Sequence, residues 1–222
     1  GRRPLDRYSL SGVRIDSRPS LRRKLRLSSA RPRIASYTRC SSDSVKVAGS
    51  NDGVPLNRML FVFGFDMLNT TQVRIGFAGK DVYAAKSLIK RVQSNTADYA
   101  LIRLDRKVTG RPALKIAPNE PLAIGKGIFV IGHPSGLPTK LADGAAISQV
   151  KATTFLSNLD TFAGNSGSPI FGGQSGAIIG VLDEGQKDYV KKGQCNVVNT
   201  LPNNKGSEGA TRASALDLTA LK

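Results

Sequence analysis

The pattern of apolar and polar positions changes sharply at residue 58. Residues 1–35 show neither a helical stripe nor a sustained alternation, so we expect irregular structure there. From residue 58 onward, short apolar runs follow one another at regular spacing with turn-forming residues between them, which is typical of an all-β barrel or sandwich. The strands that we expect are 58–65, 72–77, 98–108, 128–132, 145–152, 170–171 and 177–182.

Two further segments are harder to assign from the pattern. Between residues 80 and 92, a helical spacing of apolar positions competes with a composition rich in β-forming residues, so both a helix and a strand fit. Residues 211–221 are compatible with a closing helix. A proline-marked linker at 117–121 follows the first group of strands. We therefore divide the chain into a basic segment 1–39, a first half 40–120 and a second half 121–222.

The positive charge is concentrated at the start of the chain. The formal net charge is +17, and residues 1–40 contribute twelve basic and two acidic side chains to it. Such a segment attracts nucleic acid or anionic lipid, although a solvated, irregular arm is the simpler explanation. Apart from Tyr8 and Tyr37, the arm lacks the aromatic platforms of a dedicated nucleic-acid site, so we do not expect nucleic acid as a partner.

Composition narrows the class of protein further. No run of 18 apolar residues exists, which argues against a membrane-spanning helix. The first residue is not Met and no apolar segment follows the basic start, so no secretory signal is visible in what could be a mature, trimmed or incomplete chain. Two cysteines, Cys40 and Cys195, are too few for a disulfide framework or a zinc site, and whether they pair is open. We expect neither a metal nor a cofactor.

One stretch carries the strongest chemical signal. Residues 160–171 read Asp-Thr-Phe-Ala-Gly-Asn-Ser-Gly-Ser-Pro-Ile-Phe, which predicts a tight turn that exposes the hydroxyl of Ser166. Acyl transfer needs an exposed nucleophile beside preorganised N–H donors, here most simply those of Gly164 and Ser166. The same residue types occur in ordinary loops, so the stretch alone is not specific.

The context of this stretch makes the assignment more specific. The stretch resembles the nucleophile segment of trypsin-like serine peptidases, particularly bacterial members with Gly-Asn-Ser-Gly-Ser-Pro. Residues 95–104, with Asp98 in an Asp-x-Ala-Leu-x-x-Leu pattern, resemble the segment that carries the family's triad aspartate. Residues 129–138 are similar to the opening hairpin of the second barrel, and residues 178–185 to the strand that lines the specificity pocket. The matches follow the expected order.

This resemblance implies a fold and a chemistry. The fold is all-β, with two antiparallel six-stranded-type β-barrels, the first of them incomplete, and it favours a strand for residues 80–92. The activity is that of a serine endopeptidase, with Ser166 as nucleophile, Asp98 as triad carboxylate, and Gly164 and Ser166 as the oxyanion hole. The resemblance also implies a monomeric, secreted or periplasmic enzyme that acts on proteins or peptides without a cofactor.

The triad histidine is absent from its expected place. In the family it lies in a Thr-Ala-Ala-His-Cys-like segment, and the corresponding residues 34–40 place Arg39 before Cys40. Arginine stays protonated and cannot act as a general base. Loss of the histidine costs about a millionfold in turnover in a well-studied serine protease. The one histidine of the chain, His133, lies in a Gly-His-Pro turn, where we expect a structural role.

Two explanations for the missing histidine stay open. One is a pseudo-protease that keeps the fold for binding. The other is that the Arg/Ser/Pro-rich start is translated in a wrong frame, because the well-patterned remainder begins abruptly after it. The second explanation predicts that another frame upstream of codon 40 encodes a Thr-Ala-x-His-Cys segment.

The resemblance also indicates a substrate preference. Six residues before the nucleophile, trypsin-like enzymes place the residue at the floor of the primary pocket, and here that residue is Asp160. A carboxylate there would pair with an Arg or Lys of the substrate. Asp183 and Glu184 occupy the expected pocket wall. Alternatively, Asp160 caps the loop at Thr161 through local hydrogen bonds.

Three functions of different classes therefore stand. A serine endopeptidase accounts best for the ordered motifs. A catalytically inactive peptide-binding or protein-binding module accounts for the missing histidine. A basic nucleic-acid or surface binder accounts only for the charge of residues 1–40.

Overall fold

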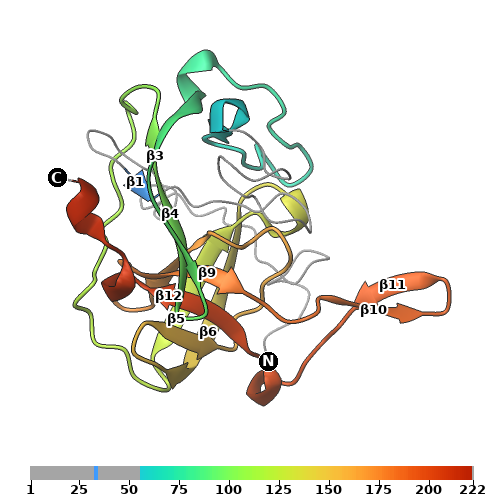
Figure 1. Ribbon diagram of the computed structural model, residues 1–222. Helices are drawn as coiled ribbons and strands as arrows, with labels where there is room; N and C mark the ends of the chain where they lie inside the picture. The colour runs from blue at the N-terminus through green and yellow to red at the C-terminus, as the bar shows by residue number, and fades with distance from the viewer. Residues whose placement is uncertain (1–32, 35–55, 222) are drawn as a thin grey trace.

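The computed structural model describes residues 33–34 and 56–221, and these form an almost entirely β structure (Figure 1). The all-β class is thereby confirmed. The strands are β1 Arg33–Ile34, β2 Leu60–Val62, β3 Val82–Ser94, β4 Ala97–Leu104, β5 Gly127–Gly132, β6 Lys140–Val150, β7 Thr154–Ser157, β8 Pro169–Gly172, β9 Ile178–Glu184, β10 Tyr189–Lys192, β11 Cys195–Val198 and β12 Glu208–Arg212. Short 3-10 turns lie at η2 Leu56–Arg58, η3 Gly79–Asp81, η4 Pro134–Gly136, η5 Asn203–Lys205, η6 Ala213–Ala215 and η7 Leu218–Leu221.

Six strands of the second half close into an antiparallel barrel. Their order is β12-β7-β6-β5-β8-β9. Successive side chains of a strand point to opposite faces, and every second one enters the barrel. In β7, for example, Phe155 and Ser157 are buried while Thr154 and Leu156 are half-buried. The interior is filled by twelve buried residues: Ile128, Val130, Ala142, Ala145, Ile147, Phe155, Leu159, Phe162, Ile170, Ile179, Leu182 and Ala210.

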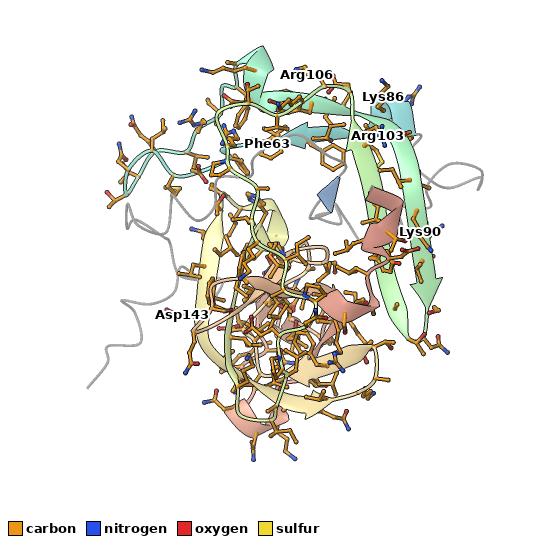
Figure 2. All side chains as sticks on the ribbon, turned by 90° about the vertical axis from the view of Figure 1, so that its left-hand side faces the viewer. Phe63, Lys86, Lys90, Arg103, Arg106 and Asp143 are labelled. Carbon is orange, nitrogen blue, oxygen red and sulfur yellow. The ribbon has the colours of Figure 1, made fainter. Side chains whose placement is uncertain are left out.

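The first half forms a four-stranded sheet among the described residues, in the order β1-β4-β3-β2. The segment 80–92, for which the pattern permitted two elements, is part of the long strand β3. Register shifts follow Ala85 and Leu88, and such bulges bend the β3–β4 hairpin and increase its twist. Figure 2 shows Lys86 and Arg103 near one end of this hairpin, far from Asp143 on the barrel.

Strand β4 has buried apolar residues on both of its faces. Leu101 points toward the barrel and packs in a cluster with Val181 and Ala213. Ile102 points the other way and packs against Met59 and Ala85. Because β4 carries two apolar faces, it joins the small core of the sheet to the barrel.

Further contacts hold the two halves together. Ile116, immediately before the linker, forms a parallel bridge with Ile178 at the start of β9. The Tyr99 hydroxyl of β4 accepts a hydrogen bond from the Asp217 N–H (3.0 Å), and the Asp217 carboxylate pairs with Lys90 of β3. The segment after β12 is thus tied to the β3–β4 hairpin.

The strand expected at residues 72–77 is absent. Only an isolated bridge forms there, and the side-chain oxygen of Asn69 accepts hydrogen bonds from the N–H groups of Thr71 and Gln72 (2.9 Å each). Ile75 is 88% exposed. The alternating pattern was misleading because no neighbouring strand pairs with this segment, and Val73 and Phe77 are only half-buried.

The closing helix expected at residues 211–221 is also wrong. Thr211 and Arg212 belong to β12, which pairs with both β7 and β9, and the remainder forms 3-10 turns. Pairing on both sides of Thr211 overrode the local helical pattern.

No helix within residues 33–34 and 56–221 is long and apolar enough to cross a membrane.

Candidate active site

Ser166 lies in the tight turn that leads into β8. The Ser168 N–H donates to the Asn165 carbonyl (2.8 Å), and Gly167, at the third position of this turn, has a φ of 88° that favours glycine. Ser166 is half-buried, and no hydrogen bond engages its hydroxyl among the described residues. The turn therefore presents an uncommitted hydroxyl group.

The two predicted oxyanion donors are also uncommitted. Among the described residues, the N–H groups of Gly164 and Ser166 donate no backbone hydrogen bond. The N–H groups of the neighbouring residues are engaged. Asn165 N–H donates to the Phe162 carbonyl (2.9 Å), and Gly167 N–H donates to the Leu182 carbonyl (2.6 Å). An incoming substrate oxygen would find two donors without an internal partner, as an oxyanion hole requires.

The peptide before these donors is held on both sides. The Ala163 N–H donates to Asp188 Oδ2 (2.7 Å), and the Ala163 carbonyl accepts from the Ser135 N–H (2.6 Å). Ser135 has a φ of 52°, the one positive φ of a non-glycine residue in the described part of the chain. Gly164 has a φ of 98°, and a Cβ there would lie 3.0 Å from the His133 carbonyl oxygen. These contacts set the direction of the loop that precedes the nucleophile.

Strand β9 holds the nucleophile turn directly. The Gly167 N–H donates to the Leu182 carbonyl (2.6 Å), and the Leu182 N–H donates to the Ser168 carbonyl (3.0 Å). Leu182 of β9 thus holds the two residues that follow Ser166, Gly167 and Ser168, through one backbone hydrogen bond to each.

Asp98 is linked through Thr211 of β12 to Asp183, the residue that follows Leu182 in β9. Its N–H donates to the Thr211 Oγ1 (2.9 Å), and the Thr211 hydroxyl donates to the Asp183 carboxylate. Thr211 is fully buried, whereas Asp98 is exposed, so this link is only partly shielded from water. Since Asp183 follows Leu182 in β9, the structure brings the Asp98 segment and the Ser166 turn to adjacent residues of one strand.

The two carboxyl groups at this junction interact. Burial raises the pKa of Asp183 to about 6, and the nearby Asp98 adds to the increase while the Thr211 hydroxyl opposes it. Above its raised pKa, Asp183 adds a negative charge beside Asp98. Such charge stabilises a cationic base formed during proton transfer from a serine.

Asp160 belongs to a second acidic group. Although Asp160 is exposed at the surface, desolvation by the surrounding chain and the nearby Asp188 raise its pKa to about 6. Burial also raises the pKa of Glu208, with Asp188 and Asp160 contributing. The Glu208 carboxylate accepts hydrogen bonds from the Thr161 hydroxyl and the Gln186 N–H (3.0 Å). The Thr161 loop is therefore tied by Glu208, and three carboxyl groups gather before the nucleophile turn.

The residues predicted as pocket wall are separate from this group. Asp183 points to Thr211 and lies near Asp98. Glu184 is exposed and lies against Gly209. Asp160 is thus brought together with Asp188 and Glu208, rather than with Asp183 and Glu184.

His133 is engaged in its own turn. Its Nδ1 is 3.0 Å from the Leu137 carbonyl oxygen, and its ring stacks on Phe65 with 5.7 Å between ring centres. Burial lowers its pKa, against the opposing effects of Leu137 and Asp66. These contacts fit the structural role expected from the sequence. Arg39, at the predicted place of the missing histidine, lies outside the described residues.

Sequence reasoning missed several residues of this site. Asp188, Glu208 and Thr211 all come from the segment after β9, which has a polar composition and few apolar runs. A weak signal was present, because the small residues of 209–210 next to Thr211 permit close packing in a strand. Only barrel closure brings these side chains to the nucleophile loop.

Comparison with protein families gives one match. A family model described as "Trypsin-like peptidase domain" matches residues 47–181. No curated protein matches the chain.

Several solved structures are similar at low identity. An inactive mutant of Rv3671c from M. tuberculosis shares 17% identity over 63% of this chain and 64% of that chain, with a TM-score of 0.43. A serine endoprotease from Yersinia pestis shares 20% over 60% and 41%, with a TM-score of 0.45. A Glu endopeptidase in complex with MPD shares 17% over 64% and 63%, with a TM-score of 0.45. The match thus spans less than two thirds of each of these proteins.

Proposed function

The chain belongs to the trypsin-like peptidase family, whose model matches more than half of its residues, and on this premise we propose that it is a serine endopeptidase by lineage. Its chemistry is peptide-bond hydrolysis through an acyl-enzyme on Ser166. The observation that carries this proposal is the meeting of the Ser166 turn and Asp98 at adjacent residues of β9, Leu182 and Asp183.

Each residue has a role in this mechanism. The Ser166 hydroxyl attacks the carbonyl carbon of the scissile bond, and the N–H groups of Gly164 and Ser166 stabilise the negative charge that develops on its oxygen. The Asp98 carboxylate orients the base that accepts the Ser166 proton and stabilises that base once it is charged.

The base itself is the weak point of this chain. By family resemblance its position is that of Arg39, which cannot accept a proton. His133 is engaged with Leu137 and Phe65. We therefore propose that this copy turns over substrate far more slowly than a family member with a complete triad, by up to about a millionfold.

Labelling of Ser166 with a fluorophosphonate tests the proposal. The Arg39→His variant should label on Ser166 faster than the unmodified chain, and the Ser166→Ala variant should not label. Peptide mapping by mass spectrometry identifies the modified residue. Labelling that persists in Ser166→Ala, or that occurs only on another residue, would contradict the assignment of the nucleophile.

The preference for Arg or Lys in the substrate is part of the proposal. Support comes from the gathering of Asp160, Asp188 and Glu208, because a cationic side chain would relieve the repulsion among three carboxyl groups. Peptidyl phosphonates with Lys, Leu or Glu at the primary position measure the preference on the Arg39→His variant. Asp160→Asn should reduce the selectivity for Lys. Faster labelling by the Glu or Leu reagent would remove Asp160 from this role.

A second candidate function is a peptide-binding module with an inactive site. The engagement of His133 in its own turn favours it, since no other histidine exists in the sequence. This function predicts that the chain folds stably and binds peptides, while Ser166 stays unlabelled in both the unmodified chain and Arg39→His.

A further inference from the structure

The β10–β11 hairpin projects from the body of the molecule as a two-stranded ribbon (Figure 1). Its residue pairs are Tyr189–Val198, Val190–Val197, Lys191–Asn196 and Lys192–Cys195. Within the described residues, neither outer edge has a neighbouring strand. An isolated two-stranded hairpin is marginally stable in water, and unpaired edges are templates for an added strand. The ribbon is therefore suited to receive a further strand.

One face of the ribbon combines apolar and charged side chains. Tyr189 and Val198 lie opposite each other in register, so they share a face, and they are 38% and 39% exposed. Lys191 follows two residues after Tyr189, which places it on the same face. A ligand strand on this ribbon would meet an apolar patch at the base and a positive charge farther out.

The charge of the ribbon is all of one sign. Residues 189–198, which form the ribbon, include Lys191 and Lys192 and contain no acidic residue, and Lys205 follows in η5. All three lysines are exposed, and none has an ion-pair partner in the described part of the chain. Their charge is complementary to a ligand with carboxylates.

The base of the ribbon reaches the loop that precedes the nucleophile. The Tyr189 ring packs on Phe162 with 5.8 Å between ring centres, and its hydroxyl lies 3.3 Å from Ser135 Oγ. The neighbouring Asp188 accepts the Ala163 N–H (2.7 Å). A chain that lies along the ribbon is therefore directed toward the loop at Ala163, three residues before the nucleophile.

We propose that the β10–β11 ribbon is a docking surface for an extended, acidic segment of a protein substrate, which adds to the ribbon as a strand. The substrate segment alternates apolar residues, which cover Tyr189 and Val198 on one face of the ribbon, with Asp or Glu on the opposite face, which pair with Lys192. Lys191, on the face of Tyr189, adds to the positive charge that attracts the acidic segment. The identity of the bound segment as part of a substrate rests on the proposed peptidase function.

The chemistry favours a peptide over a nucleic acid. The unpaired edges offer alternating N–H and C=O groups, and only another polypeptide strand can pair with both. The ribbon carries a single aromatic ring, that of Tyr189, and this ring already packs on Phe162. A stacking platform for bases usually needs several exposed rings.

Binding of a fluorescent peptide tests the proposal without any catalytic step. The probe is a short, labelled peptide that alternates Glu and Val, and fluorescence anisotropy measures its affinity for the full chain under reducing conditions. The double variant Lys191→Gln/Lys192→Gln should weaken binding about three- to tenfold, since each exposed pair contributes modestly. Val198→Ser should weaken it as well.

A matched variant distinguishes docking on the ribbon from non-specific electrostatic attraction between the acidic peptide and the basic protein. Lys86→Gln/Arg103→Gln removes the same number of positive charges from the β3–β4 hairpin (Figure 2), and it should change the affinity by less than about twofold. A peptide with Gln in place of Glu, and one with N-methyl groups on alternate residues, should both bind more weakly than the probe.

Several results would overturn the proposal. These are no binding of the probe, equal weakening by the two double variants, and full affinity of the N-methylated peptide. A single-stranded oligonucleotide of equal charge that binds more tightly than the probe, with the same dependence on Lys191 and Lys192, would also overturn it. Because the assay needs no turnover, an unreactive Ser166 leaves it interpretable, and a reactive Ser166 without peptide binding overturns the ribbon proposal alone.

Discussion

The barrel and the sheet differ in how completely they bury their apolar residues. The barrel encloses twelve buried residues in one cluster, whereas the sheet's own cluster contains Met59, Ala85 and Ile102. Leu60 of β2 is 63% exposed. In a closed barrel every strand has two neighbours, while an open sheet leaves side chains at its edges in contact with water. We infer that most of the folding energy of the described residues resides in the barrel.

The two regions also differ in net charge and in the residues that they supply to the proposed active site. Residues 56–120 contain eleven basic and five acidic residues, whereas residues 121–222 contain nine basic and seven acidic ones. The barrel supplies Ser166, the proposed oxyanion donors and the Asp160 group, and the sheet supplies Asp98. The proposed active site therefore depends on the junction at β9, where the less completely packed region must stay attached to the barrel.

The largest difference between the two regions is expected in how much a core substitution lowers the free energy of unfolding. Ile170→Ala in the barrel should lower the free energy of unfolding by an amount near the upper end of the usual range of about 2–5 kcal/mol, and Ile102→Ala in the sheet by an amount near the lower end. Ile170 and Ile102 are both almost fully buried, at 0% and 1% exposed. Urea denaturation measures both values. Equal losses would mean that the sheet is packed as tightly as the barrel.

The junction should respond to loss of a single hydroxyl. Thr211→Val keeps the shape of the side chain but leaves the Asp98 N–H and the Asp183 carboxylate without this partner. We expect a loss of about 1–3 kcal/mol in the free energy of unfolding and a further rise in the pKa of Asp183. Denaturation and carboxyl NMR titration measure the two effects. Thr200→Val, at an exposed position, serves as control and should change stability by less than about 0.5 kcal/mol.

The smallest effect expected is a dependence of stability on pH that arises at the junction. The pKa of Asp183 is raised to about 6 in the folded chain, so the folded state binds this proton more tightly than the unfolded state. Its stabilising contribution is present below about pH 4 and is lost as the pH rises toward 6. After allowance for solvent screening, the loss is about 1–2 kcal/mol.

The Asp183→Asn variant isolates this contribution. It removes the titration but keeps an oxygen for the Thr211 hydroxyl, so its stability should vary less between pH 4 and 6 than that of the unmodified chain. Asp160→Asn is the matched variant in the barrel, because the pKa of Asp160 is also raised to about 6. If Asp183→Asn left the pH dependence unchanged, titration of Asp183 would not be its cause.

Local sequence determined a substantial part of this protein. The apolar runs at 128–132, 170–171 and 177–182 correspond to β5, β8 and β9, because these strands are buried enough that composition alone identifies them. The turn at Ser166 was also predictable, since positive φ angles at Gly164 and Gly167 require residues that tolerate them.

Tertiary structure alone decided which polar groups meet. Thr211 and Asp98 are 113 positions apart, and Glu208 and Thr161 are 47 apart, yet each pair shares a hydrogen bond. The pattern within a short window predicted a helix at residues 211–221, but pairing of β12 with β7 and β9 made the start of that window a strand. Backbone preferences act over a few residues, whereas barrel closure selects the partners of a buried side chain from the whole chain.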